Sequence, residues 1–158
     1  MNEILKLIGI TIVPFLELRA SIPYGLFRTS LSPLAVFFVT VISNILFGVV
    51  LYWMINNALH LLLRFRKLYA LYQKTIAHAQ KKVQPYIHKY GILGLAAFIA
   101  VPLPGSGVYS AALGASVLGF SSKDFFIATV IGVIIAGIIV MLISTAGNEA
   151  LAFLIKTI

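Results

Sequence analysis

Three long stretches without a charged residue constrain the fold more than any other feature of this sequence. They run from Thr29 to Leu63, from Tyr90 to Ser122 and from Phe125 to Asn148. Each is longer than the roughly 20 apolar residues that a helix needs to cross a bilayer. Charged residues make up only 10% of the chain, against about a quarter in soluble domains. The sequence therefore predicts an all-α, multi-pass protein of the cell membrane, with one membrane domain over 1–158.

Basic residues are concentrated between two of the hydrophobic blocks. Seven of the twelve lie between Arg64 and Lys89, a segment without an acidic residue, and the net charge is +8. This pattern is typical of a cytoplasmic segment, here an amphipathic helix over about 62–83 that contacts anionic lipid headgroups. Because the basic residues lie between two hydrophobic blocks, we do not expect nucleic acid to be a partner. No cysteine is present, which excludes disulfides and thiolate chemistry.

The first hydrophobic block is too short to span a bilayer. It runs from Ile4 to Leu16 and is followed by Glu17 and Arg19, which are flanked by Pro14 and Pro23. As a helix it would extend about 20 Å, less than the roughly 30 Å of hydrocarbon. We expect the chain to enter the membrane, break over about 14–23 and return through a short arm over about 21–27. A long helix over about 33–60 follows, with Ser32 as its cap.

The second half repeats this order of elements. A short apolar block from Tyr90 to Val101 is followed by the turn Pro102 to Gly107, then by an arm over about 108–118. Two prolines and two glycines in that turn rule out a continuous helix. Ser121 and Ser122 then offer a cap for a second long helix that reaches about residue 148. Leu151 to Ile158 forms a tail or a continuation of that helix.

An internal repeat relates the two halves. A shift of 89 positions aligns Ser21 with Ser110, Gly25 with Gly114, Ser32 with Ser121, Thr40 with Thr129 and Gly48 with Gly137. With a cytoplasmic segment over 61–89 between them, the units over 1–60 and 90–158 would have opposite topology. The sequence thus predicts two inverted repeats, each a re-entrant helical hairpin followed by a long transmembrane helix, as in many transporters.

Glu17 and Arg19 are the leading candidates for a functional site. They lie at the turn of a hydrophobic hairpin, where an unpaired charge is costly and ionisable residues are usually functional. They could pair with each other, line a water-filled vestibule or, in the case of Arg19, hold an anionic head group such as a phosphate. Glu17 could bind and release the proton of a coupled transporter. The alternative is a hairpin tip that reaches the interface, with both charges in water.

The turn from Pro102 to Gly107 offers a second set of groups. Free amides at the start of the arm that follows would attract an anion, and Ser106, Tyr109 and Ser110 add hydroxyls. An equal alternative is that the turn only reverses the chain, with glycines chosen for close packing.

Other polar residues carry weaker signals. Asp124 fits the first turn of a helix, with a second proton site as the minor alternative. Asn44 in the first long helix needs a partner, which could be a neighbouring helix or a substrate. Gly132 and Gly137 indicate close helix packing. The sequence contains no pattern typical of a metal site, a cofactor site or a catalytic set, so we expect no enzyme activity.

Two segments resemble a known family. The run from Pro14 to Gly25, with Glu17, Arg19, Pro23 and Gly25, and the run Val101 to Gly107 are similar to the small multi-drug export family. More distantly, the hairpin-plus-helix repeat resembles the DedA superfamily, which is associated with lipid translocation, including polyprenyl-phosphate recycling, and with proton-coupled transport. The resemblance gives Glu17 and Arg19 the acidic and basic positions of the first hairpin. The arginine of the DedA second hairpin has no counterpart here.

These observations predict a proton-coupled transporter of an amphipathic anion, such as a lipid (polyprenyl) phosphate, that contacts membrane lipids and could form a homodimer. The alternatives are export of small amphipathic drugs and a non-transporting scaffold that recruits lipid or a partner through the basic segment. The predicted substrate site comprises Glu17, Arg19, Pro23, Asn44, Pro102, Pro104, Gly105, Ser106, Gly107, Tyr109 and Ser110, with Glu17 and Asp124 as proton sites.

Overall fold

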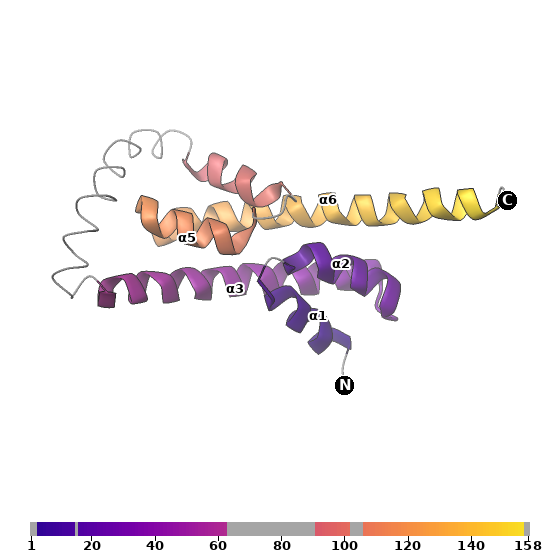
Figure 1. The fold of residues 1–158 in the computed structure, drawn as a ribbon, viewed down its shortest axis with the longest axis horizontal. Helices are drawn as coiled ribbons and strands as arrows, with labels where there is room; N and C mark the ends of the chain where they lie inside the picture. Colours follow the sequence, from indigo (N-terminus) through magenta and orange to yellow (C-terminus); the bar gives the residue numbers. More distant parts are fainter. Residues whose placement is uncertain (1–2, 15, 63–90, 102–105, 157–158) are drawn as a thin grey trace.

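The computed structural model describes residues 3–14, 16–62, 91–101 and 106–156, and every regular element in these ranges is a helix (Figure 1). The prediction of an all-α chain is confirmed for this part. The predictions for the basic segment over 61–89 fall almost wholly outside it, as do those for Pro102, Pro104 and Gly105.

The first hairpin consists of α1 (Glu3–Ile12) and α2 (Glu17–Arg28), which pack on each other and on α3 (Pro33–Leu62) (Figure 1). The chain reverses in one tight turn, where the Val13 carbonyl accepts the amides of Leu16 and Glu17 at 3.2 and 3.3 Å. Close packing of α2 on α3 requires Gly25, because a Cβ there would lie 2.4 Å from the Val36 side chain.

The break expected over 14–23 is wrong in its extent. It is confined to residues 13–16, and Pro23 lies inside α2 rather than at the turn. The proline removes one backbone hydrogen bond, a local cost. The helix continues through it because α2 buries one face that includes Leu18, Ile22 and Gly25. Glu17 and Arg19 therefore begin a helix instead of lying in an irregular loop.

The second hairpin consists of a short helix, Gly91–Ala100, and α5 (Val108–Leu118). Its first helix packs closely on α6 (Ser122–Lys156) at Gly132. A Cβ at this glycine would lie only 2.7 Å from both the Ala96 carbonyl oxygen and the Ile99 Cβ. The start of α2 meets the start of α5 near the middle of the molecule (Figure 1). This meeting point brings together residues that are about 90 positions apart in the sequence.

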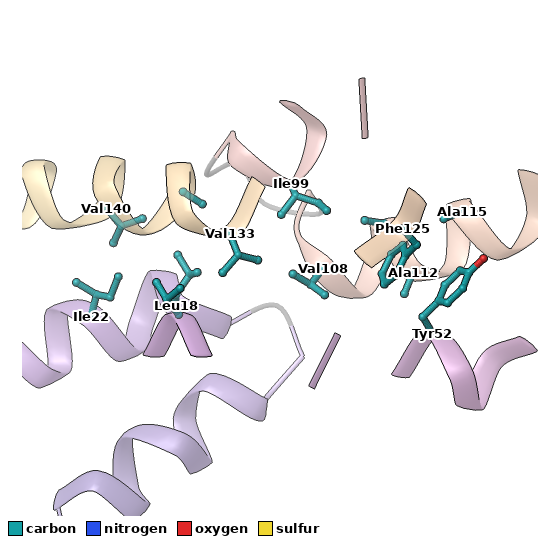
Figure 2. Packing of buried hydrophobic residues seen from close by; sticks show 13 residues of the cluster. Leu18, Ile22, Tyr52, Ile99, Val108, Ala112, Ala115, Phe125, Val133 and Val140 are labelled. Carbon is teal, nitrogen blue, oxygen red and sulfur yellow. The ribbon is translucent and has the colours of Figure 1, made fainter. Parts of the chain in front are cut away.

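The long helices α3 and α6 run antiparallel and form the core with the hairpins (Figure 1). The rings of Tyr52 and Phe125 stack with centroids 4.1 Å apart. Further along, a Cβ at Gly137 would lie 2.9 Å from Phe37 and Val41, which confirms the prediction of close packing at this glycine. Figure 2 shows Leu18 and Ile22 of α2 facing the Val133 to Val140 side of α6, with Val108 near the centre.

Serine caps begin both long helices, as predicted. The Ser32 hydroxyl accepts the Ala35 amide at 3.3 Å, and the Ser121 hydroxyl accepts the Asp124 amide at 3.1 Å. These bonds satisfy donors that the first turn of a helix leaves free. The helix α6 continues to Lys156, so of the predicted tail or continuation over 151–158, residues 151–156 continue the helix.

Two helical segments are long and apolar enough to cross a membrane, Pro33–Ala58 and Ser122–Gly147, each of 26 residues. Only 28% and 39% of their most apolar windows are buried inside the protein, whereas a core helix of a soluble protein is mostly buried. Their outward faces expose large apolar side chains such as Leu34, Trp53 and Leu142 at 63% or more. Such continuous apolar faces are stable in lipid rather than in water.

Candidate functional site

Glu17 lies at the contact between the two hairpins and is only 4% exposed. Its Oε2 accepts the Val108 amide at 3.4 Å and its Oε1 accepts the Tyr109 amide at 3.3 Å. These are the first amides of α5, which have no partner within the helix and carry its positive dipole end. The anion position predicted at this helix start is therefore filled by a carboxylate of the chain itself.

The backbone at this contact is strained to bring the two turns together. Glu17 has a φ of +45°, the one positive φ among the described non-glycine residues. Such a conformation costs on the order of 1–3 kcal/mol and is concentrated at functional sites. On the other side Gly107 has a φ of +129°, and a Cβ there would lie 2.6 Å from Oε2 of Glu17. Only glycine fits this position without displacing the carboxylate.

Arg19 bridges the same two hairpins, two residues after Glu17. Its Nη2 donates to the Ser106 carbonyl at 2.6 Å, to the Ser106 hydroxyl at 2.9 Å and to the Val101 carbonyl at 3.3 Å. The Ser106 hydroxyl in turn donates to the Val101 carbonyl at 2.5 Å. The three bonds from Arg19 all use Nη2, so within the described residues Nη1 and Nε keep their donor capacity for another partner.

Tyr109 completes the contact from the first turn of α5. Its hydroxyl donates a short hydrogen bond to the Ile12 carbonyl at the end of α1. Its ring packs against Phe47 of α3, with centroids 5.2 Å apart. The two hairpins are thus joined by a carboxylate, a guanidinium and a phenol.

The structure brings together five of the predicted site residues, Glu17, Arg19, Ser106, Gly107 and Tyr109. Pro23 lies inside α2, away from the hairpin turn, and Asp124 lies in the first turn of α6, beside the Tyr52 and Phe125 pair. Ser110 lies in the first turn of α5.

Asn44 lies inside α3, is 1% exposed, and finds no hydrogen-bond partner among the described residues. The interhelical bond that we considered for it is therefore not made here.

Sequence reasoning missed Val108, the first residue of α5, whose side chain is fully buried against Gly48. The alignment of Gly48 with Gly137 in the repeat was the available signal for a close contact at this point.

Residues 17–139 match the protein family described as "Putative small multi-drug export protein". The chain belongs to this family. The match begins at Glu17 and includes both halves of the hairpin contact. Together with the two long apolar helices, membership in this export family makes the chain a membrane protein. No curated protein and no solved structure matches the chain, so the more distant likeness to the DedA superfamily stays a prediction.

Proposed function

We propose that this member of the small multi-drug export family is a proton-coupled transporter of an amphipathic anion such as a lipid phosphate. The observation that carries the proposal is the bond between the Glu17 carboxylate and the first two amides of α5. A buried acid that occupies an anion-binding helix start can exchange places with an anionic substrate, which couples protonation to binding.

The depth of the contact supports a transport role. Gly48, which packs on Val108, lies 15 residues after Pro33 and 10 before Ala58 in the apolar span of α3. If α3 crosses the bilayer, the contact lies near the midplane, where secondary transporters bind substrates and coupling ions. An acid at that depth is costly unless it has a function or a partner.

The charges at the contact favour an anion over a cation. The site combines the positive guanidinium of Arg19 with the α5 helix start, equivalent to roughly +0.5 charge. The ionised Glu17 balances this positive charge. Once Glu17 takes up a proton, the site becomes positive and its amides are free, so a phosphate would bind together with the proton. A cationic drug would meet a site that is at best neutral.

The packing of the long helices supports an inverted repeat. Gly48 of α3 contacts Thr129 of α6, and Gly137 contacts Phe37 and Val41, the neighbours of Thr40. A shift of 89 maps Gly48 onto Gly137 and Thr129 onto Thr40, so the second contact lies within one helical turn of the position that a two-fold axis between the halves would give. The same symmetry would let the two hairpins exchange environments, with opposite sides of the membrane open in turn.

Export of small amphipathic drugs is the second candidate, and the description of the family favours it. Both functions use the same meeting point of the two hairpins. They differ in the charge of the molecule that the site prefers, so a comparison of two substrates separates them.

The test is transport by purified protein in proteoliposomes under a pH gradient, with farnesyl phosphate and ethidium as the two substrates. Glu17→Gln and Arg19→Ala should each lower farnesyl phosphate transport about 10- to 100-fold, the effect of losing a charge-assisted bond. The matched controls are Glu3→Gln and Arg28→Ala, because Glu3 bonds Ser30 at the protein surface and Arg28 is exposed.

The controls should transport like the parent chain. If Glu17→Gln and Arg19→Ala both transport farnesyl phosphate at the rate of the parent chain, the proposed site is wrong. Movement of ethidium alone would select drug export. A scaffold would transport neither substrate. Its activity in cells would be abolished when the basic residues between Arg64 and Lys89 are replaced by neutral ones.

A further inference from the structure

The side chain of Val108 fills a notch in α3. A Cβ at Gly48 would lie 2.2 Å from Cγ1 of Val108 and 3.4 Å from Cγ2 of Thr129 in α6. Val108 and Thr129 are both fully buried. Three helices thus meet at the missing side chain of one glycine, and the isopropyl group of Val108 occupies the space.

Two buried polar side chains flank this notch without partners. Asn44 lies one turn before Gly48 on α3, and neither its Nδ2 nor its Oδ1 is hydrogen-bonded within the described residues; the same holds for Oγ1 of Thr129. Each such buried group costs on the order of 1–3 kcal/mol relative to a bonded one. Native proteins leave few of these groups, and each calls for an explanation.

Thr40 shows that the lack of a partner at Thr129 is not a property of threonine in these helices. It is the counterpart of Thr129 in the repeat and is equally buried. Its hydroxyl nevertheless donates to the carbonyls of Val36 at 2.9 Å and Phe37 at 3.1 Å. Thr129 forgoes this common backbone bond, at the point where it contacts the notch.

The residue that fills the notch is also held by Glu17. The Val108 amide donates to the Glu17 carboxylate, so the bond that secures the start of α5 also secures the side chain in the notch. Release of that amide would free Val108 to leave Gly48. The space it vacates borders the Thr129 methyl group and lies one helical turn from Asn44. Rotation about the Cα–Cβ bond of Thr129 would bring its hydroxyl to the position of that methyl group.

We propose that the Gly48 notch is a binding subsite for an oxygen of the substrate head group, with the Asn44 amide and the Thr129 hydroxyl as donors and Val108 as its cover in this conformation. A phosphate oxygen, with several lone pairs, can accept from both donors at once. This inference rests on the proposed transport function and assigns to it a place for the head group.

The first test uses the absence of cysteine from the chain. Thr129→Cys and Thr40→Cys are labelled with 2-aminoethyl methanethiosulfonate in proteoliposomes without substrate, which makes the result independent of transport. Thr129→Cys should react and Thr40→Cys should not. Adding Val108→Ala should raise the labelling rate of Thr129→Cys about tenfold. The two methyl groups that it removes stabilise, by their burial, the conformation in which Val108 covers the notch.

Equal labelling of the two cysteines, or none at either, would overturn the inference, as would a rate that Val108→Ala leaves unchanged. The second test compares Asn44→Leu and Thr129→Val with Thr40→Val. The first two variants should be at least as thermally stable as the parent, because they remove unpaired groups, but should raise the KM for farnesyl phosphate at least severalfold. An unchanged KM would refute the roles of Asn44 and Thr129. If the parent chain moves no farnesyl phosphate, the proposed function fails, and the labelling rates still decide whether the notch opens.

Discussion

The fit of Val108 into α3 gives the sharpest prediction, which concerns Gly48→Ala. The added Cβ would lie 2.2 Å from Cγ1 of Val108, whereas carbon atoms in contact are about 3.5–4.0 Å apart. Either helix must then shift by more than about 1 Å. Overpacking of this kind costs about 1–3 kcal/mol, and here it would also pull the Val108 amide away from Glu17.

The compensating variant is Val108→Ala. Alone it removes two buried methyl groups and should cost about 2 kcal/mol, from lost burial and the remaining cavity. In the double variant the new Cβ would lie 3.6 Å from the Cβ of residue 108, an ordinary contact. The two alanines refill the space, so the double variant should lose only about 1–2 kcal/mol, less than the sum of the two single effects.

The measurement is reversible unfolding of the purified protein in mixed micelles by titration with dodecyl sulfate, followed by far-ultraviolet circular dichroism. The control is Gly114→Ala in the same helix as Val108, because a Cβ there meets nothing within 4 Å. It should be neutral or stabilise by up to about 1 kcal/mol. Single effects at Gly48 and Val108 that add to within about 0.5 kcal/mol would refute the notch as described.

Three further predictions follow from single contacts. Gly107→Ala should abolish transport, since its Cβ would lie 2.6 Å from the Glu17 carboxylate at a φ of +129°; transport at the level of the parent would contradict the site geometry. Tyr52→Phe should lower the unfolding free energy by about 1 kcal/mol, because its hydroxyl donates to the Phe120 carbonyl at 2.6 Å, and should leave the ring stack intact in near-ultraviolet dichroism. Ser121→Ala should cost about 1 kcal/mol in the same unfolding assay, because the cap of α6 is lost, and an unchanged midpoint would argue against that cap.

Local chemistry made the long helices predictable. A serine before the first turn and a run of more than twenty uncharged residues mark the start and most of the length of α3 and α6 in the sequence. The hairpins were recognisable because each apolar block is too short to span and ends in a turn-forming segment. These features depend on residues that are near one another in the chain, which is where sequence patterns carry information.

The extent of the first break could not be predicted in the same way. Proline disfavours a helix interior by a few kcal/mol, and we therefore expected Pro23 to border the break rather than to lie inside a helix. The structure keeps the helix because α2 packs between α3 and α6, burying Leu18 and Ile22. That tertiary contribution is invisible until the partners of α2 are known.

The candidate site was predictable in kind but not in its pairing. Buried charges beside a turn with free amides indicated a site, and both halves do meet. From the sequence we expected the first amides of α5 to bind an anion from outside the chain, whereas in the structure they donate to the Glu17 carboxylate. This pairing joins residues 91 and 92 positions apart, so neither the spacing nor the composition around Glu17 could indicate it.

The internal pairing also changes what the missing second arginine means. A clamp of two arginines would hold a phosphate by charge alone and would need no proton. With Arg19 as the cation at the described contact, the site gains net positive charge only while Glu17 is neutral. Under the proposed function, a single arginine beside a carboxylate would suit coupling, because the substrate would be held tightly only in the state that also carries the proton.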